Sequence, residues 1–185
     1  HGPSGDFEPS GYFRKRNWYD DTHRLILIGE KEGRPPLDEI YRSSLSWALD
    51  LVRKPIVPRR HNGLRAYTAW AYDLLRDEYF PQDNLEALFN RLDCHFAEMV
   101  VASEGRWHAG QFLRRIVTHV PAMSEALGQA AACYDAESKM IAKIAELQGG
   151  WNPHDEKIAR KLVEPTLRRQ ISTLIIQARD KDKEA

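Results

Sequence analysis

One stretch of apolar periodicity, residues 84–120, constrains the fold more than any other part of this chain. Apolar and small side chains recur in it at steps of three and four: Leu85, Leu88, Phe89, Leu92, Phe96, Met99, Val100, Ser103, Trp107 and Gly110. This spacing places them on one face of an α-helix. Asp83 or Asn84 can cap its start, and Pro121 ends it. Because the periodicity keeps its phase across Gly105, we expect one long helix rather than two.

Further amphipathic segments flank this helix in the sequence. They predict a helix that begins at Pro36 and ends before Pro55, helices over residues 64–79, 122–148 and 153–163, and a last helix that begins at Pro165. The polar tail, residues 179–185, is expected to fray. Long amphipathic helices joined by short turns pack as antiparallel neighbours. Residues 36–185 are therefore predicted to form an all-α, up-and-down bundle of four to six helices.

Residues 1–35 differ in composition, because Gly and Pro alternate there with aromatic side chains. This composition predicts an extended arm rather than a helix. Within it, residues 24–30 (RLILIGE) have four consecutive aliphatic side chains before a glycine and read as the only convincing strand. Since one strand cannot form a sheet, it pairs either with the arm or with a region outside this chain. The start at His1, without methionine, suggests a fragment, a processed chain or a tag remnant.

Charge and cysteine content exclude several classes of partner. The 27 basic residues balance the 27 acidic ones, so no net field attracts nucleic acid or an anionic membrane. No apolar run approaches the ~20 residues that span a bilayer, and the N-terminus lacks a signal-peptide pattern. Cys94 and Cys133 fall inside helical patterns without metal-type spacing, which predicts buried free thiols. We therefore expect a cytoplasmic protein.

Glu137 is the most unusual residue for chemistry, because it lies on the apolar face of the helix predicted over residues 122–148. A buried carboxylate is costly unless it is paired or protonated. If the two longest helices are antiparallel and joined at Pro121, Arg106 and Trp107 lie level with Tyr134 and Glu137. The sequence therefore predicts an Arg106–Glu137 ion pair. Such a pair can simply fix the helix register, or it can belong to a functional pocket.

A pocket between these two helices would draw its lining from both of them. Its candidate residues are His95, Arg106, Trp107, Cys133, Tyr134 and Glu137. Tryptophans on apolar faces are more simply core residues than ligand-stacking platforms, and this holds for Trp47, Trp70 and Trp107. No glycine-rich phosphate loop, dinucleotide-binding pattern or nucleophile elbow occurs, so the sequence implies no cofactor.

Metal binding and cysteine catalysis are both disfavoured by helical geometry. His95 and Glu98 are spaced like metal ligands on one helix, but the further pair, Glu104 and His108, does not converge on the same face. We predict no metal site. Cys94 directly precedes His95, so the two side chains point about 100° apart and cannot form a nucleophile–base pair.

Several phrases of the sequence resemble a known group of proteins: RLILIGEK, LSWALDL, GLRAYTAWAYDLLRDEYFP, EGRWHAGQFLR, AACYDAE and QARDKDKEA. Over residues 24–185 they are similar to the helical C-terminal portion of uncharacterised bacterial and archaeal proteins. The N-terminal portion of those proteins resembles papain-like cysteine peptidases and the butirosin-biosynthesis acyltransferase. The resemblance implies that a nucleophilic cysteine and its histidine lie upstream of His1. It carries over His95, Glu104, Arg106, Trp107, Tyr134 and Glu137, with no role established for them.

Three hypotheses about function follow. The first is an accessory or substrate-binding helical domain of a cysteine-peptidase-like or acyltransferase-like protein, with the upstream domain as its partner. The second is a stand-alone small-molecule enzyme or binding protein with a pocket around Glu137. The third is an interaction or oligomerisation module that pairs with a second copy of itself. An enclosed polar pocket containing Glu137 would favour the second, and a flat apolar surface around residues 7–30 would favour the first or third.

Overall fold

The computed structural model describes residues 33–57 and 60–185. The predicted strand at residues 24–30 and nearly all of the arm therefore lie outside the described residues. The elements in chain order are α1 (Leu37–Val52), β1 (Ile56–Val57), β2 (Arg60–His61), α2 (Leu64–Asp73), η2 (Asp77–Tyr79), α3 (Leu85–Ile116), η3 (Pro121–Met123), α4 (Ser124–Gln148), α5 (Glu156–Lys161) and α6 (Pro165–Glu184). The all-α prediction is confirmed, and the long central helix runs through Gly105 without a break.

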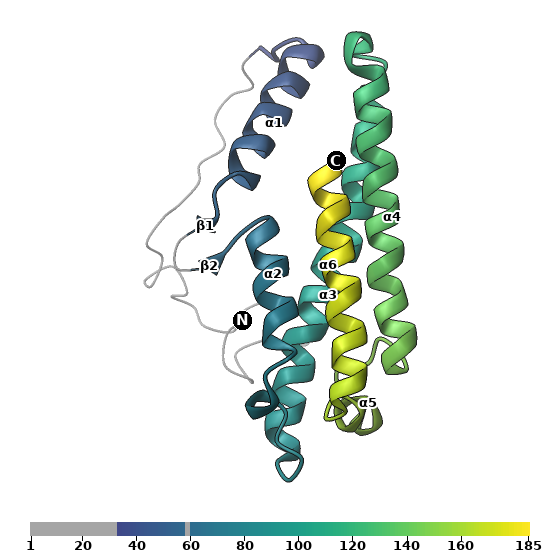
Figure 1. The fold of residues 1–185 in the computed structure, drawn as a ribbon. Helices are drawn as coiled ribbons and strands as arrows, with labels where there is room; N and C mark the ends of the chain where they lie inside the picture. The colour runs from purple at the N-terminus through teal and green to yellow at the C-terminus, as the bar shows by residue number, and fades with distance from the viewer. Residues whose placement is uncertain (1–32, 58–59) are drawn as a thin grey trace, which may run out of the picture. The chain divides into compact units, whose positions relative to one another are not determined.

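Helices α2, α3, α4 and α6 form an up-and-down bundle (Figure 1), in which α3 packs on α4, α4 on α6 and α6 on α2. Side-chain contacts show that neighbours run in opposite directions. Arg168, near the start of α6, donates from Nε to the carbonyl of Leu74 at the end of α2 (2.8 Å). Arg179, near the end of α6, donates to the Thr68 hydroxyl near the start of α2 (3.2 Å). The predicted antiparallel topology is therefore correct.

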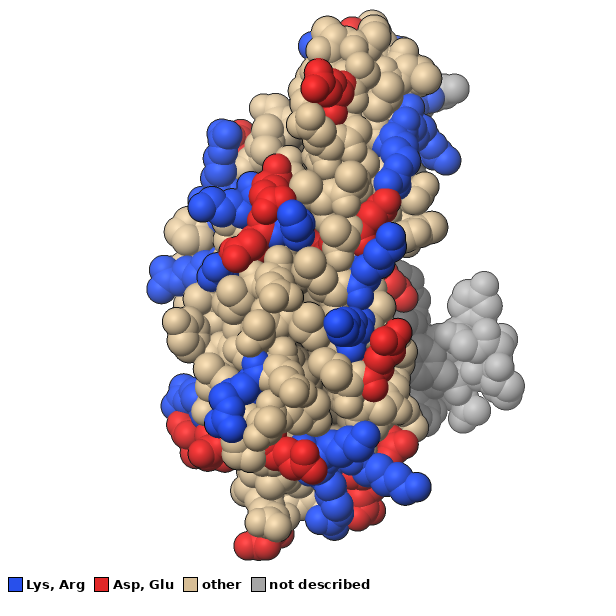
Figure 2. Space-filling model, turned by 45° about the vertical axis from the view of Figure 1, so that its right-hand side comes forward, with Lys and Arg blue, Asp and Glu red and all other residues tan. Residues whose placement is uncertain are grey.

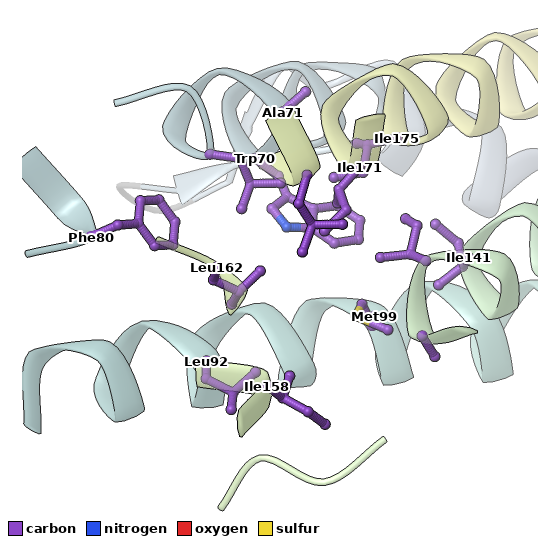
Figure 3. Packing of buried hydrophobic residues seen from close by; sticks show 14 of the residues in the cluster. Trp70, Ala71, Phe80, Leu92, Met99, Ile141, Ile158, Leu162, Ile171 and Ile175 are labelled. Atoms are coloured by element: carbon purple, nitrogen blue, oxygen red, sulfur yellow. The ribbon is translucent and has the colours of Figure 1, made fainter. Parts of the chain in front are cut away.

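The main hydrophobic core fills the interior between these four helices and α5 (Figure 3). Each bundle helix contributes fully or nearly fully buried side chains, which include Ala71, Leu92, Met99, Ile141, Ile171 and Ile175. Ile158 and Leu162, from α5 and the residue that follows it, close one end of this core. Truncating a side chain such as Ile171 to alanine would cost about 2–5 kcal/mol, because a close-packed interior cannot collapse fully around the cavity.

Helix α1 belongs to the same unit as the bundle but contributes no buried residue. Two of its side chains, Tyr41 and Leu45, pack against a second, smaller cluster formed by the ends of α3 and α4. The Tyr41 ring meets the Phe112 ring edge-on at 6.0 Å. Trp47, predicted to be a core residue, is 68% exposed, so that prediction is wrong, whereas Trp70 is buried as predicted.

The connection between α1 and α2 is held by two residues, Asn62 and Gly63, of the turn that precedes α2. Part of this turn is paired rather than a loop, because β1 and β2 form a short antiparallel pair. The Asn62 side-chain amide donates to the carbonyls of Leu51 (2.7 Å) and Lys54 (2.9 Å), which satisfies the C-terminal end of α1. Gly63 has φ +53°, and a Cβ at this position would lie 2.5 Å from the Val52 carbonyl oxygen. The turn therefore requires glycine.

Helix α5 is shorter than predicted and spans Glu156–Lys161 rather than residues 153–163. Two further predicted helix ends are also wrong. Helix α2 ends at Asp73 rather than at residue 79, because Arg168 binds the carbonyl of Leu74 where the next helical turn would follow. Helix α6 continues to Glu184 instead of fraying, because Ala178 and Asp182 are buried in the bundle. In both places a contact with a distant part of the chain decides where the helix stops.

Candidate functional site

A buried charge network takes one side chain from each of the four bundle helices. The Tyr67 hydroxyl of α2 donates to Oε1 of Glu137 on α4. Arg106 of α3 donates from Nε to the same oxygen at 3.2 Å and from Nη2 to Oδ2 of Asp182 on α6 at 2.8 Å. The predicted Arg106–Glu137 ion pair is therefore confirmed. Because the network joins all four helices, it fixes their register.

Glu137 is completely buried, and its second oxygen, Oε2, has no hydrogen-bond partner among the described residues. Burial raises the pKa of Glu137 to about 7, against the lowering effects of Arg106 and of the Tyr67 hydrogen bond. Burial likewise raises the pKa of Asp182, although Arg106 opposes this. Two carboxyl groups thus share one guanidinium, and the network retains a proton close to neutral pH.

Arg106 is surrounded by aromatic rings as well as by acids. Its guanidinium carbon lies 5.9 Å from the ring centre of Tyr67 and 5.5 Å from that of Tyr134. Burial alone would lower the pKa of Arg106, but Tyr67, Asp182 and Glu137 outweigh it and raise the pKa. Arg106 therefore stays charged, and with 24% of its side chain exposed it is also the network residue that reaches the surface.

His95 belongs to a second, separate network. The Trp70 indole N–H donates to His95 Nδ1 at 2.9 Å, and His95 Nε2 lies 3.1 Å from Gln148 Oε1. Because Nδ1 accepts, the ring proton is on Nε2, which donates to Gln148. Burial lowers the pKa of His95 to about 4. His95 is thus a neutral residue with both ring nitrogens engaged, and neither nitrogen is free for a metal or a proton transfer.

A groove of about 250 Å³ runs between α2 and α3, beside the charge network. Its walls are formed by Asn62, Gly63, Ala66, Tyr67, Trp70, Glu98, Val101, Ala102 and Arg106. Two further spaces share Trp70 and Glu98 with it: a hollow of about 460 Å³ beside β1 and β2, and a small cavity of about 30 Å³ that reaches His95. Trp70 and Glu98 line all three spaces. The groove therefore combines an aromatic wall with one acidic and one basic group.

Glu98 has an unusual environment for a residue on the exposed side of a helix. Its side chain contacts solvent, but the groove walls displace much of the water around the carboxylate, and Asp73 lies nearby. Burial and then Asp73 raise the pKa of Glu98 to about 7, while Arg91 lowers it in part. Among the described residues no hydrogen bond or ion pair involves this carboxylate. Within the described part of the chain, Glu98 is therefore an acid in the groove without a partner cation.

The structure separates the residues that the sequence predicted would form one pocket. Arg106, Tyr134 and Glu137 come together, but in a closed network rather than around a cavity, because Tyr67 and Arg106 lie between Glu137 and the groove. His95 lies in the other network, and Glu104 is exposed and lines none of the cavities described above. Predicting Trp107 as a core residue was wrong, because it is 50% exposed and lies edge-on against its neighbour His108.

The cysteines are placed differently from the prediction. Both are free thiols, as expected, but Cys94 is exposed and Cys133 is half-buried. Cys94 also lines the small cavity that reaches His95. The prediction that both are buried is therefore wrong. Cys133, a candidate pocket residue, lies one position before Tyr134 and takes no part in the hydrogen bonds of the charge network.

Sequence reasoning missed Asp182 and the whole groove. Asp182 follows Ile171, Ile175 and Ala178 at steps of three and four, so the inward face of the last helix continues through it. That spacing was the available signal, and it was overridden by the high charge of the tail. Glu98 lies away from the apolar line of α3, and no signal in the sequence marks it as part of a groove formed with α2.

Comparisons with protein-family models, with curated proteins and with solved structures found no match to this chain. Within residues 33–57 and 60–185, no group of three or more His, Cys, Asp or Glu side chains is placed to hold a metal ion. No helix of this part of the chain is long and apolar enough to cross a membrane. Basic and acidic side chains are intermixed on the face shown in Figure 2. The site is therefore interpreted from its own geometry.

Proposed function

We propose that this chain is a substrate-binding helical domain that holds a small organic molecule in the groove between α2 and α3. The observation that carries the proposal is the groove itself, with its aromatic wall of Tyr67 and Trp70 and its two polar groups, Glu98 and Arg106. Binding sites for small molecules are typically concave, largely apolar and equipped with a few polar groups that orient the ligand. The closed bundle beneath it supplies the rigid support that such a site needs.

Binding is favoured over catalysis by Glu137 because this carboxyl group is enclosed. Glu137 has the raised pKa that suits a general acid or base. However, it is fully buried and does not line the groove, so it cannot contact a molecule bound there. Catalysis by Glu137 would require Tyr67 or Arg106 to move. Tyr67 and Arg106 bind Glu137 and also line the groove, so the network holds this part of the groove wall in place.

The resemblance to helical regions that follow papain-like domains extends this proposal. In that arrangement the chain is the accessory part of a cysteine-peptidase-like or acyltransferase-like protein, and it presents the bound molecule to a nucleophilic cysteine elsewhere. The groove and the enclosed position of Glu137 support an accessory role, because the buried network cannot act on a molecule that is bound in the groove. The gene's full reading frame tests this extension, which requires an upstream domain with a cysteine and a histidine.

The binding role is tested by blocking the groove. Val101 lines the groove yet is 74% exposed, so Val101→Trp narrows the groove without disturbing the core. Ala97→Trp is the matched control, because Ala97 is an exposed residue of the same helix that does not line the groove. In an NMR screen of small organic molecules, binders that shift the Trp70 indole signal should lose affinity in the first variant only. A screen without any binder at this groove would refute the proposal.

A second candidate function is association with another copy of the chain through α1. This helix is amphipathic, but it buries no residue among the described residues, and Trp47, Leu49 and Val52 are exposed on it. Exposed apolar patches of this kind mark protein contacts. If α1 mediates dimerisation, light scattering should show a dimer that Trp47→Glu converts to a monomer. A monomeric wild-type protein at high micromolar concentration would exclude this candidate.

A further inference from the structure

We infer, on the basis of the proposed binding role, that the groove takes an organic amine. Its ammonium group lies between the carboxylate of Glu98 and the indole of Trp70, and a carbonyl oxygen farther along the ligand accepts from Arg106.

The position of the ammonium group follows from the groups of Trp70 and Glu98 that are not engaged in hydrogen bonds with other described residues. The indole N–H of Trp70 is already donated to His95, so Trp70 offers the groove only its ring, whose face attracts cations. The Glu98 carboxylate has no ion-pair or hydrogen-bond partner among the described residues. Both side chains line each of the three spaces, so an ammonium group placed between them contacts both.

Among the described residues, the basic groups around Glu98 do not fully stabilise its carboxylate, so one more cation would be stabilised there. Within the described part of the chain, the titratable and charged groups that line the three spaces with it are Tyr67 and Asp73 of α2, Arg60 and His61 of β2, and Arg91, Cys94, His95 and Arg106 of α3. His95 is held neutral by burial, which lowers its pKa. The pKa of Glu98 is raised to about 7 in spite of Arg91, so the basic groups do not compensate the burial of Glu98 and its repulsion by Asp73. A bound ammonium group would supply the missing counter-charge.

Arg106 defines the other end of the ligand. Its Nε and Nη2 are engaged with Glu137 and Asp182, whereas Nη1 has no partner among the described residues. Because two carboxyl groups already share this guanidinium, a neutral carbonyl oxygen fits better than a third anion. Glu98 and Arg106 are eight residues apart on α3, which is about 12 Å along the helix axis. The ligand is therefore an elongated molecule with an amine at one end and a carbonyl group toward the other.

The test uses a set of linear probes that differ by one group each. The ω-amino amide 8-aminooctanamide carries both groups, its N-acetyl derivative lacks the cation, and octylamine lacks the carbonyl. Affinities are measured by NMR titration against the wild-type chain, Glu98→Gln and Asp93→Asn. Asp93 is an exposed acid of the same helix that does not line the groove, so its variant controls for general charge effects.

We expect the amino amide to bind more tightly than octylamine, and at least tenfold more tightly than the N-acetyl derivative. Glu98→Gln should remove the preference for the amine, whereas Asp93→Asn should retain it. Because Glu98 must be ionised, the affinity of the wild-type chain should rise about tenfold from pH 6 to pH 8. In Glu98→Gln this rise should be absent, because the variant has no carboxylate to ionise. A rise that persists in this variant would come from another group.

Two results would overturn the inference while leaving the binding role intact. One is a groove ligand that binds equally well with and without its amine. The other is a pH-dependent affinity that persists in Glu98→Gln. A failure of the binding role itself looks different, because then no probe of any charge shifts the Trp70 signal, and Val101→Trp has no effect on any titration.

Discussion

Arg106 and Glu137 are 31 positions apart in the sequence and lie on different helices, yet Arg106 Nε donates to Glu137 Oε1 at 3.2 Å. Asp182 and Tyr67 bring the remaining two bundle helices to the same pair. A buried ion pair contributes little net stability compared with apolar residues of the same shape, but breaking it leaves an unpaired buried charge. The pair therefore acts mainly to select one register of the four helices.

The first prediction concerns the loss of Arg106. Arg106→Met retains most of the side-chain volume but leaves Glu137 and Asp182 buried without a counter-charge. We expect the free energy of unfolding to fall by about 3–5 kcal/mol, which is typical when one partner of a buried pair is removed. Urea denaturation followed by circular dichroism at pH 7.5 measures this change.

Arg114→Met is the matched control, because Arg114 also pairs across α3 and α4, with Asp135. Both partners of this pair are substantially exposed, so its loss should cost less than about 1 kcal/mol. The triple variant Arg106→Met, Glu137→Gln, Asp182→Asn should recover much of the stability lost by Arg106→Met, since it removes the unpaired charges. Equal costs for the two arginine variants would show that burial of the network is energetically unimportant.

The second prediction concerns the pH dependence of stability. The pKa of Glu137 is raised from 4.5 to about 7 in the folded state. The folded state therefore holds this proton more tightly than the unfolded state, and the associated stability is complete below pH 4.5 and lost as the pH rises to about 7. Glu137→Gln resembles the protonated carboxyl group at every pH. Relative to the wild type, this variant should gain about 3 kcal/mol between pH 4.5 and pH 8.

Urea denaturation of both proteins at several pH values measures this difference. Comparing the variant with the wild type cancels the contributions of other groups, including His95, whose lowered pKa makes stability fall as the pH drops from 6.5 toward 4. A difference that stays constant with pH would mean that Glu137 is ionised throughout the range. A difference of the opposite sign would mean that Arg106 dominates over burial.

The third prediction concerns the tautomer of His95. Because the Trp70 indole donates to Nδ1, the His95 proton should be on Nε2, and the ring should stay neutral down to about pH 4. Nitrogen-15 chemical shifts of the imidazole report both properties directly. An Nδ1-protonated ring, or a protonated His95 at pH 6, would contradict this assignment.

Trp70→Phe extends the same prediction to stability. The substitution keeps an aromatic ring but removes the N–H that satisfies His95 Nδ1. Leaving a buried acceptor unpaired costs about 1–3 kcal/mol. Tyr72→Phe is the control, because Tyr72 is 64% exposed and should be nearly neutral. If both variants are equally stable, the Trp70–His95 hydrogen bond does not contribute to the fold.

The sequence predicted well those features that depend on local periodicity. The central helix through Gly105, the antiparallel bundle and the Arg106–Glu137 pair follow from the spacing of apolar residues and from equal distances to the turn at Pro121. The pair was predictable because one acid on an apolar face needs a cation on the neighbouring helix at the same level. Local pattern and tertiary structure agree at these positions.

Features that depend on long-range packing were not predictable in the same way. Trp47 and Trp107 lie on apolar helical faces, yet both are exposed among the described residues, since periodicity shows which side is apolar but not whether another element covers it. Asp182 stays helical because Arg106, far away in the sequence, binds it. The groove has no sequence signature, because Glu98 and Trp70 come together only when α2 is placed beside α3.

The fourth prediction compares two glycines whose replacement by alanine should have opposite effects. Gly63 precedes α2 with φ +53°, and an added Cβ would lie 2.5 Å from the Val52 carbonyl oxygen. Gly63→Ala should therefore cost at least about 1–2 kcal/mol, because L residues are strained at positive φ and the backbone of α1 must also shift.

Gly105 lies inside α3 with open space around its Cα. Gly105→Ala should stabilise the protein by about 0.5–1 kcal/mol, since alanine loses less conformational entropy in a helix. Thermal unfolding of the two variants measures both shifts. The two changes in stability should have opposite signs because the glycines have different roles. Gly63 permits a turn that requires a positive φ, whereas Gly105 is only tolerated in a helix that tertiary contacts hold together. A destabilised Gly105→Ala would reveal a contact on that face of α3, and a neutral Gly63→Ala would show that the junction between α1 and α2 is not fixed by Asn62 and Gly63.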